Sequence, residues 1–143
     1  MVDCEIWRIV MAEKIFDKIG GETQVRRLVE RFYDLIEHDP KDQSLHQLHQ
    51  RGHGLTHAKQ AQFEFLCEFF GGPKYFSTRH KAMNLRQIHA HVPMTQTQGQ
   101  TWLRLMQQAL SDCQITEPNA STIMTTFQRA ADVLVNDAKM RAQ

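Results

Sequence analysis

Among the eight histidines of this chain, His89 has the sequence neighbours that most favour metal binding. A neutral imidazole is a good ligand for transition metals and binds them through one ring nitrogen. If the surrounding segment is a short helix, Leu85 at i−4 and Val92 at i+3 share a face with His89. That face sets the imidazole in an apolar stripe. A lone histidine in such a stripe is more often a core residue bonded to a backbone carbonyl, so its wider surroundings must decide its role.

A second group of histidines lies in the polar segment between the second and third predicted helices. Four of them follow one another at spacings of three or four, which a helix could align on one face: His46, His49, His53 and His57. Gly52 and Gly54 interrupt such a helix, and Lys41–Leu55 is predicted as a loop with one helical turn near Leu45–His49. A metal site built from these histidines is therefore an alternative use of the chain.

The elements that must position these side chains are helices, because apolar residues recur at helical spacing and no convincing alternating strand is present. Between Thr23 and Ile36 one face carries an apolar stripe: Val25, Leu28, Val29, Phe32, Leu35 and Ile36. Gly20-Gly21 is expected to end a short helix over residues 12–19, and Asp39-Pro40 to end the long one.

The third helix is expected to run from a cap at Thr56 to Phe70. One of its faces combines small, polar and aromatic side chains: Ala58, Ala61, Gln62, Phe65 and Phe69. Gly71-Gly72-Pro73 is a firm stop after this helix, since glycine accepts the backbone of a helix end and proline cannot continue the helix.

Beyond this stop we expect one or two short turns and then a short helix over residues 84–90 that ends before Pro93. A helix that begins at residue 96 or 97 runs to Cys113, and Pro118 lies near the first turn of the last helix. One side of that last helix is apolar: Ile123, Phe127, Ala131 and Leu134. The predicted fold class is all-α, with about four substantial helices joined by long connections.

The composition argues against two broad classes of partner. The chain has 143 residues, enough for one domain with one core. Lys plus Arg total 17 against 16 acidic residues, so no basic field attracts nucleic acid or an anionic membrane. No run approaches the ~18 apolar residues that a membrane helix needs. Acids occupy the segment Met1–Glu5, where a secretory signal has lysines, so we expect a cytoplasmic protein.

The three cysteines are expected to be free thiols. Cys4, Cys67 and Cys113 are odd in number, far apart and in no Cys-x-x-Cys pair. This pattern argues against a disulfide framework, a thiolate zinc site and covalent cofactor attachment through Cys-x-x-Cys-His. Free buried thiols in a reducing compartment are the expected state.

The spacing of a few motifs resembles the truncated haemoglobins of group II. Gly71-Gly72-Pro73 is followed by His89 at 18 residues from Gly71, and Trp102 follows at 13 residues from that histidine. The resemblance covers roughly Ile15 to Val135. It implies a two-over-two helical sandwich of the truncated globin type around a haem b, with residues 1–143 as a single domain. Residues 1–11 would then be an N-terminal extension, and residues 136–143 a C-terminus prone to fraying.

The resemblance implies that His89 is the axial ligand of the haem iron. The run Leu85-Arg86-Gln87-Ile88-His89 is similar to the family's Leu-Arg-x-x-His, whose histidine has that role. Beside it the chain departs from the family: His91 and Val92 stand where proline and phenylalanine are usual, and Lys81-Ala82-Met83 replaces Gly-His-Pro. These departures concern the path of the chain around the ligand and leave the ligand itself in place.

Two residues on the other side of the iron are implied in the same way. Phe32-Tyr33 resembles the family's Phe-Tyr, whose tyrosine points its hydroxyl at the bound ligand. The run from Trp102 to Met106 resembles Trp-Leu-x-x-Met, whose tryptophan offers its indole N–H to the ligand. We therefore expect Tyr33 and Trp102 to be distal hydrogen-bond donors.

A third distal position is open between several residues. Leu48-His49 resembles a Leu-His of some group II members, although His46 or His53 could take this role. Ala58 fits the position where other globins keep a distal histidine, and a small residue there leaves the pocket open. One turn on, Gln62 replaces an expected leucine; it either bonds ligand or water, or turns outward.

Further residues are expected at the haem from their place in the resemblance. Candidates for packing against the ring are largely aromatic or apolar: Phe63, Phe65, Phe69, Phe76, Leu85, Arg86 and Met106. Candidates for the propionates are cationic: Lys59, Arg79, His80, Lys81 and Arg86. For any single one of these the ordinary role, a core side chain or a solvated charge, is more common.

The resemblance implies a protein that binds oxygen, carbon monoxide and nitric oxide. A hydrogen bond to a charged acceptor is worth ~1.5–3 kcal/mol, so two donors would slow oxygen release. Slow release suits retention, or redox chemistry as a nitric oxide dioxygenase or a peroxidase-like enzyme fed by a reductase, more than bulk oxygen transport. We expect a monomer or weak homodimer. The alternatives are a non-haem protein with a His-rich metal site and a cofactor-free helical interaction module.

Overall fold

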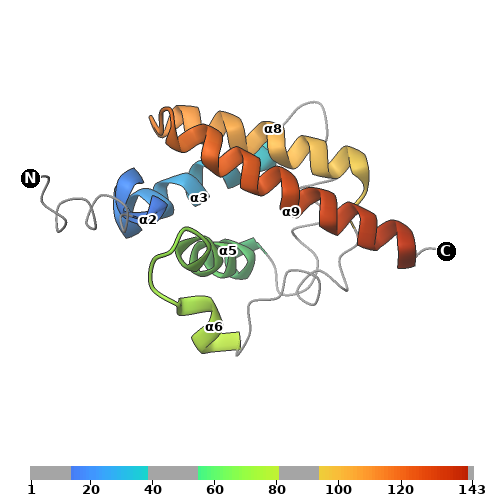
Figure 1. Ribbon diagram of the computed structural model, residues 1–143, viewed down its shortest axis with the longest axis horizontal. Helices are drawn as coiled ribbons and strands as arrows, with labels where there is room; N and C mark the ends of the chain where they lie inside the picture. Colours follow the sequence, from blue (N-terminus) through green and yellow to red (C-terminus); the bar gives the residue numbers. More distant parts are fainter. Residues whose placement is uncertain (1–13, 39–54, 81–93, 142–143) are drawn as a thin grey trace, which may run out of the picture.

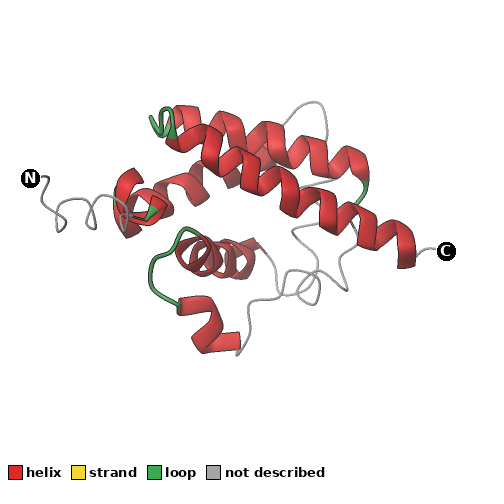
Figure 2. Ribbon diagram, in the orientation of Figure 1, coloured by secondary structure: helices red, strands yellow, loops and turns green. Residues whose placement is uncertain are grey.

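The computed structural model of this protein describes residues 14–38, 55–80 and 94–141, and every structural statement below concerns these residues. They form helices and connecting turns, with no strand among them (Figure 2). The helices are α2 (Ile15–Ile19), α3 (Gly21–His38), α5 (Leu55–Phe69), α6 (Tyr75–His80), α8 (Gln96–Asp112) and α9 (Asn119–Arg141).

The four long helices form a two-over-two sandwich. α3 packs against both α5 and α8, and α8 packs along α9, which runs back in the opposite direction (Figure 1). The short α6 folds under α5, and α2 lies against α3 and α9. The predicted all-α sandwich is confirmed. None of the helices in the described ranges has the length and apolar character needed to cross a membrane.

α3 is the helix that the sequence predicted best. Its apolar stripe lies in the core: Val25, Leu28, Val29, Phe32 and Ile36 are at most 1% exposed, and Leu35 is half-buried. The helix begins two residues before the predicted start and ends at His38, immediately before the predicted stop. The stripe is buried because α3 lies between α5 and α8 and packs against both of them.

α5 is buried on two sides, and the sequence revealed only one of them. The predicted face of small, polar and aromatic residues is half-buried along its whole length. A second face packs fully into the core against α3, through Phe63, Leu66, Cys67 and Phe70. Burial of each large apolar side chain contributes ~1.5–3 kcal/mol, so this second face anchors the helix. The predicted cap at Thr56 is wrong, because Leu55 before it is already helical.

The Gly-Gly-Pro stop is confirmed, and its geometry explains both glycines. Gly71 has a φ of +93°, which glycine adopts without steric cost. The N–H groups of Gly71 and Gly72 donate to the last carbonyls of α5, at 2.9 Å to Glu68 and 2.8 Å to Cys67. A Cβ on Gly72 would lie 2.6 Å from the ring of Phe16, so α2 packs directly on this turn.

The remaining helix boundaries differ little from those predicted. The first helix begins at Ile15, because Lys14 is extended, so it is shorter than expected. Thr95 caps α8 in a reciprocal capping box with Gln98, and the helix ends at Asp112. α9 buries the predicted side: Ile123, Phe127, Ala131 and Leu134. It continues through residues 136–141, the part that we expected to fray.

Two of the three cysteines lie in the described residues, and both are free and buried, as predicted. Burial raises the pKa of the Cys67 thiol to about 11, so the group stays protonated at neutral pH. Burial also raises the pKa of Cys113. Both residues therefore serve as small core side chains rather than as nucleophiles.

The contact between Gly72 and Phe16 gives the first prediction. Gly72→Ala forces the new methyl group into the Phe16 ring, and we expect the free energy of unfolding to fall by ~1–3 kcal/mol. Urea unfolding followed by circular dichroism measures it. In a Phe16→Ala background the same substitution should cost much less, because the clashing ring is gone. An equal cost in both backgrounds would mean that the ring is not the obstacle.

Candidate functional site

A partly buried polar pair joins α3 to α5. The hydroxyl of Tyr33 donates to Oε1 of Gln62 at 2.9 Å. Tyr33 is 1% exposed, and its ring meets that of Phe32 edge-on at 5.6 Å between centroids. Burial raises the pKa of Tyr33, so its hydroxyl keeps its proton throughout the physiological range. Gln62, whose direction the sequence left open, therefore turns inward to Tyr33.

Trp102 of α8 lies beside this pair. Its indole ring is half-buried and meets Phe32 at 5.1 Å and Phe127 at 5.0 Å, both edge-on. Phe32 thus contacts both the Tyr33 ring and the Trp102 ring. The two residues predicted as distal donors are brought together by one intervening phenylalanine.

Aromatic rings continue from Trp102 across α9 to α5 and α6. Phe127 stacks on Phe69 at 5.5 Å, Phe69 stacks on Phe65 at 5.6 Å, and Phe65 meets Phe76 edge-on at 5.3 Å. Phe65 and Phe69 are half-buried, whereas Phe76 is buried. Three of the predicted ring-packing residues therefore form one contiguous set.

The half-buried residues define the shape of the site. From α5 they are Ala58, Gln62, Phe65 and Phe69, and from α8 they are Trp102 and Leu103. Met106, predicted at the haem, is fully buried in the core, and the neighbouring Leu105 is 4% exposed. A mainly apolar, aromatic face with a polar pair at one end is the surface that a flat hydrophobic cofactor with a small polar ligand requires.

Several predicted site residues lie outside the described part of the chain. They include the expected axial ligand and its motif, and the three candidates for the third distal position: His46, His49, His53, Leu85, Arg86 and His89. His57, the fourth member of the His-rich group, is an exposed residue of α5. Within the described ranges, no three His, Cys, Asp or Glu side chains are grouped so that they could hold a metal ion.

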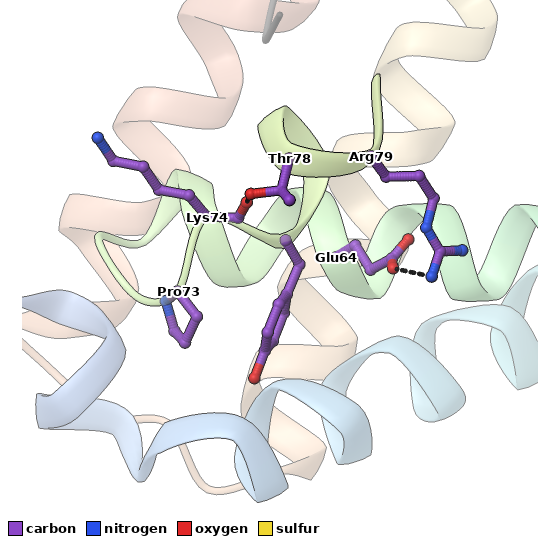
Figure 3. Close-up of a pocket in the computed structure, with 6 residues that line it drawn as sticks. Glu64, Pro73, Lys74, Thr78 and Arg79 are labelled. Carbon is purple, nitrogen blue, oxygen red and sulfur yellow. Dashed lines mark hydrogen bonds and ion pairs between the residues drawn. The ribbon is translucent and has the colours of Figure 1, made fainter. Parts of the chain in front are cut away.

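Two of the cations proposed for the propionates pair with carboxylates of the protein. Lys59 Nζ lies 3.3 Å from Glu30 Oε2, and Arg79 Nη2 lies 3.0 Å from Glu64 Oε1 (Figure 3). Glu64 is 5% exposed, which is rare for a carboxylate unless it is paired. The sequence reasoning missed this pair. Its signal was the acid Glu64 between Phe63 and Phe65, since a charge inside an apolar run predicts a partner of opposite charge.

Glu64 also lines a cavity between α5 and α6, of ≈ 510 Å³ (Figure 3). Its other walls are Pro73, Lys74, Tyr75, Thr78 and Arg79. Glu64 follows Gln62 by two helical residues, so the two side chains leave α5 on nearly opposite sides. This charged cavity is therefore separate from the aromatic face and does not belong to the candidate site.

The fold and the aromatic face together define a globin of the two-over-two class. The family model of the bacterial-like globins matches residues 14–136. The chain therefore belongs to the bacterial-like globin family, and its relatives identify it as a truncated haemoglobin of group II.

Similar proteins occur in plants and bacteria. The group 2 truncated hemoglobin 3-1 of Lotus japonicus is 28% identical over 130 residues, covering 90% of this chain and 76% of the relative. The crystal structure of the hemoglobin of Chloroflexus aurantiacus is 34% identical with a TM-score of 0.74, covering 85% of this chain and 97% of that one. The cold-adapted truncated hemoglobin of Pseudoalteromonas haloplanktis is 26% identical with a TM-score of 0.78, covering 87% and 98%.

Haem is the cofactor of this family, and the described residues fit it. Phe65, Phe69 and Trp102 offer flat apolar surface, and the Tyr33–Gln62 pair adds the polar end that a gas ligand needs. The chain is thus a haem globin that binds diatomic ligands such as oxygen. Membership in the family argues against the cofactor-free interaction module that the sequence alone left possible.

The Glu64–Arg79 pair generates the second prediction. Arg79→Met removes the ion-pair partner of a buried carboxylate, and we expect unfolding to become easier by ~1–2 kcal/mol. The loss is smaller than for a fully buried pair because the Arg79 side chain is 60% exposed. Urea unfolding measures it. Lys59→Met, which leaves an exposed carboxylate (Glu30, 52% exposed) without its partner, should cost less than ~1 kcal/mol.

Haem release, measured by transfer to an excess of a haem-free acceptor protein, distinguishes this structural role from a propionate contact. We expect Arg79→Met to leave the release rate unchanged. Faster release with an unchanged unfolding midpoint would show that Arg79 serves the cofactor instead.

Proposed function

We propose that this globin retains oxygen through distal hydrogen-bond donors and suits redox chemistry on the bound gas more than oxygen transport. The observation that carries the proposal is the partly buried hydrogen bond between Tyr33 and Gln62, together with the half-buried indole of Trp102, which contacts Phe32 beside Tyr33 in α3. These three residues bring polar hydrogens to an otherwise apolar face. Oxygen held at a ferrous haem is polarised, so such hydrogens favour it over less polar ligands.

His89 is proposed as the axial ligand of the iron. The support comes from its position in the chain: it lies 18 residues after Gly71 and 13 before Trp102, in a Leu-Arg-x-x-His motif. A neutral imidazole from His89 would hold the iron, and the haem would supply the site at which the gas binds. The haem iron supplies the redox chemistry, and the residues of the chain supply orientation and electrostatics.

The donors would act by lowering the rate at which bound oxygen is released. Each hydrogen bond to a charged acceptor is worth ~1.5–3 kcal/mol, and each 1.4 kcal/mol changes a dissociation constant about tenfold. Donors from Trp102 and the Tyr33–Gln62 pair would therefore hold oxygen for long times. Long retention favours oxidation of nitric oxide, or use of peroxide, with electrons from a reductase. Nitric oxide consumption by the oxygen-loaded protein tests the first activity, and peroxide-dependent dye oxidation tests the second.

Removal of the axial ligand is the third prediction. His89→Gly should abolish the ordinary haem absorption spectrum, because the glycine offers the iron no nitrogen. Free imidazole added to this variant should enter the space left by the side chain and partly restore the spectrum. Absorption spectra in both redox states measure both effects. If His46, His49 or His53 proved indispensable instead of His89, the assignment would be wrong.

Removal of the indole donor is the fourth prediction. Trp102→Phe keeps an aromatic ring in contact with Phe32 and Phe127 but removes the N–H of the indole, which is the one donor of this side chain. We expect oxygen to dissociate ~10-fold faster or more, equivalent to at least ~1.4 kcal/mol. Carbon monoxide is less polar when bound and should respond much less. Stopped-flow release rates for the two gases decide the matter, since equal effects on both would mean that Trp102 controls access only.

A further inference from the structure

We propose that the cavity between α5 and α6 is a second ligand site, separate from the haem, and that it takes a small aromatic carboxylate. The cavity of ≈ 510 Å³ is lined by Glu64 of α5 and by five residues of α6 and of the turn before it. Ligand sites in proteins commonly measure ~300–1,000 Å³, so a molecule of one or two rings has room here. None of the six lining residues belongs to the aromatic face that fits the haem.

The anchor for the charge of the ligand is Arg79. Its Nη2 lies 3.0 Å from Oε1 of Glu64, which is buried, whereas the Arg79 side chain is 60% exposed. A guanidinium carries five N–H donors in a planar fork, so the contact with Glu64 leaves donors for a second carboxylate. Because the buried partner already holds the guanidinium, an incoming anion has less side-chain entropy to remove.

The side chains around the cavity leave one positive charge unbalanced. They include one carboxylate, that of Glu64, and two cations, Lys74 and Arg79, which lie on opposite sides of Thr78 (Figure 3). Among the described residues no carboxylate pairs with Lys74. The Thr78 hydroxyl donates to the Lys74 carbonyl at 2.7 Å, so the charged donors are the ones left for a ligand. A singly charged anion balances the cavity, whereas a dianion meets further repulsion from Glu64.

The apolar part of the cavity consists of rings. Tyr75 is 37% exposed, which is unusual among the large hydrophobic side chains that the structure describes. Its ring stacks on Phe63 with 6.5 Å between centroids, and its hydroxyl is directed at Oε2 of Glu22 at 3.4 Å. These contacts hold the ring, and Pro73 supplies a second apolar wall. Aromatic rings pack favourably on one another, so a flat ring that carries one carboxylate matches both the walls and the charge.

Binding of 2-naphthoate to the haem-loaded protein, measured by isothermal titration calorimetry, tests the proposal. Carbon monoxide is kept on the ferrous iron, so that the carboxylate cannot bind there instead. Three further probes separate the ring from the charge: acetate has the charge without the ring, 2-naphthylmethanol has the ring without the charge, and 2-naphthylmethylamine reverses the charge. We expect 2-naphthoate to bind with a dissociation constant below ~1 mM, and each of the other probes to bind at least ~5-fold more weakly.

Substitutions around the cavity locate the bound probe. We expect Arg79→Met to weaken the binding of 2-naphthoate ~5-fold and Lys74→Met ~2-fold, since both cations are lost from exposed positions. Tyr75→Ala should weaken it ~5-fold or more, whereas Tyr75→Phe should leave it unchanged, because the hydroxyl is turned to a partner on α3. Lys59→Met is the matched control: it removes a cation of α5 whose partner is Glu30, outside the cavity, and should change nothing.

Several results would overturn the proposal. Equal binding by the parent and the cavity variants would place 2-naphthoate elsewhere on the protein, and no measurable binding to the parent would mean that the cavity takes no such ligand. Tightest binding of the amine would show that the cavity takes a cation at Glu64. An equal loss in Lys59→Met would reduce the effect to net charge. Lys74→Met and Tyr75→Ala keep the ion pair between α5 and α6, so they decide the question if Arg79→Met folds poorly.

Discussion

α5 packs into the core with one face and borders the candidate site with another, and the rest of the site depends on this double role. One face, with Phe63, Leu66 and Cys67, packs into the core against α3. Another face, with Gln62, Phe65 and Phe69, stays half-buried, and its Phe69 stacks on Phe127 of α9. Because the core face fixes the rotation of α5 about its axis, it also determines that the Gln62 side chain meets the Tyr33 hydroxyl. Packing in the core thus sets the chemistry of the pocket.

Contacts near the C-terminal end of α5 hold the helix against neighbouring parts of the chain. At its C-terminus the two glycines let α2 approach so closely that the Phe16 ring covers Gly72, and the Phe16 N–H donates to the Phe70 carbonyl at 3.0 Å. α6 follows the turn and is tied back to α5 by Ser77, whose hydroxyl donates to Glu68. These contacts restrict sliding or rotation of α5, which would separate the Tyr33–Gln62 pair.

Among the residues that the structure describes, the polar groups at the aromatic face carry no charge. The polar groups at the aromatic face are a phenol of raised pKa, an amide and an indole, none of them ionised at neutral pH. The buried carboxylate of α5, Glu64, leaves the helix on another side, where Arg79 compensates it. A neutral donor stabilises a polarised ligand without fixing a full charge beside the haem.

The sequence by itself determined the helices and the position of the chemistry along them. The stripe of α3, the Gly-Gly-Pro stop, the start of α8 and the motifs with Tyr33 and Trp102 are local patterns, each decided by residues within a few positions of one another. The direction of Gln62 and the burial of Glu64 depended on the tertiary structure. Tyr33 and Gln62 are 29 residues apart, and Glu64 pairs with a residue of the next helix. A hydrogen bond or ion pair between helices depends on their relative rotation, which long-range packing decides and local periodicity does not encode.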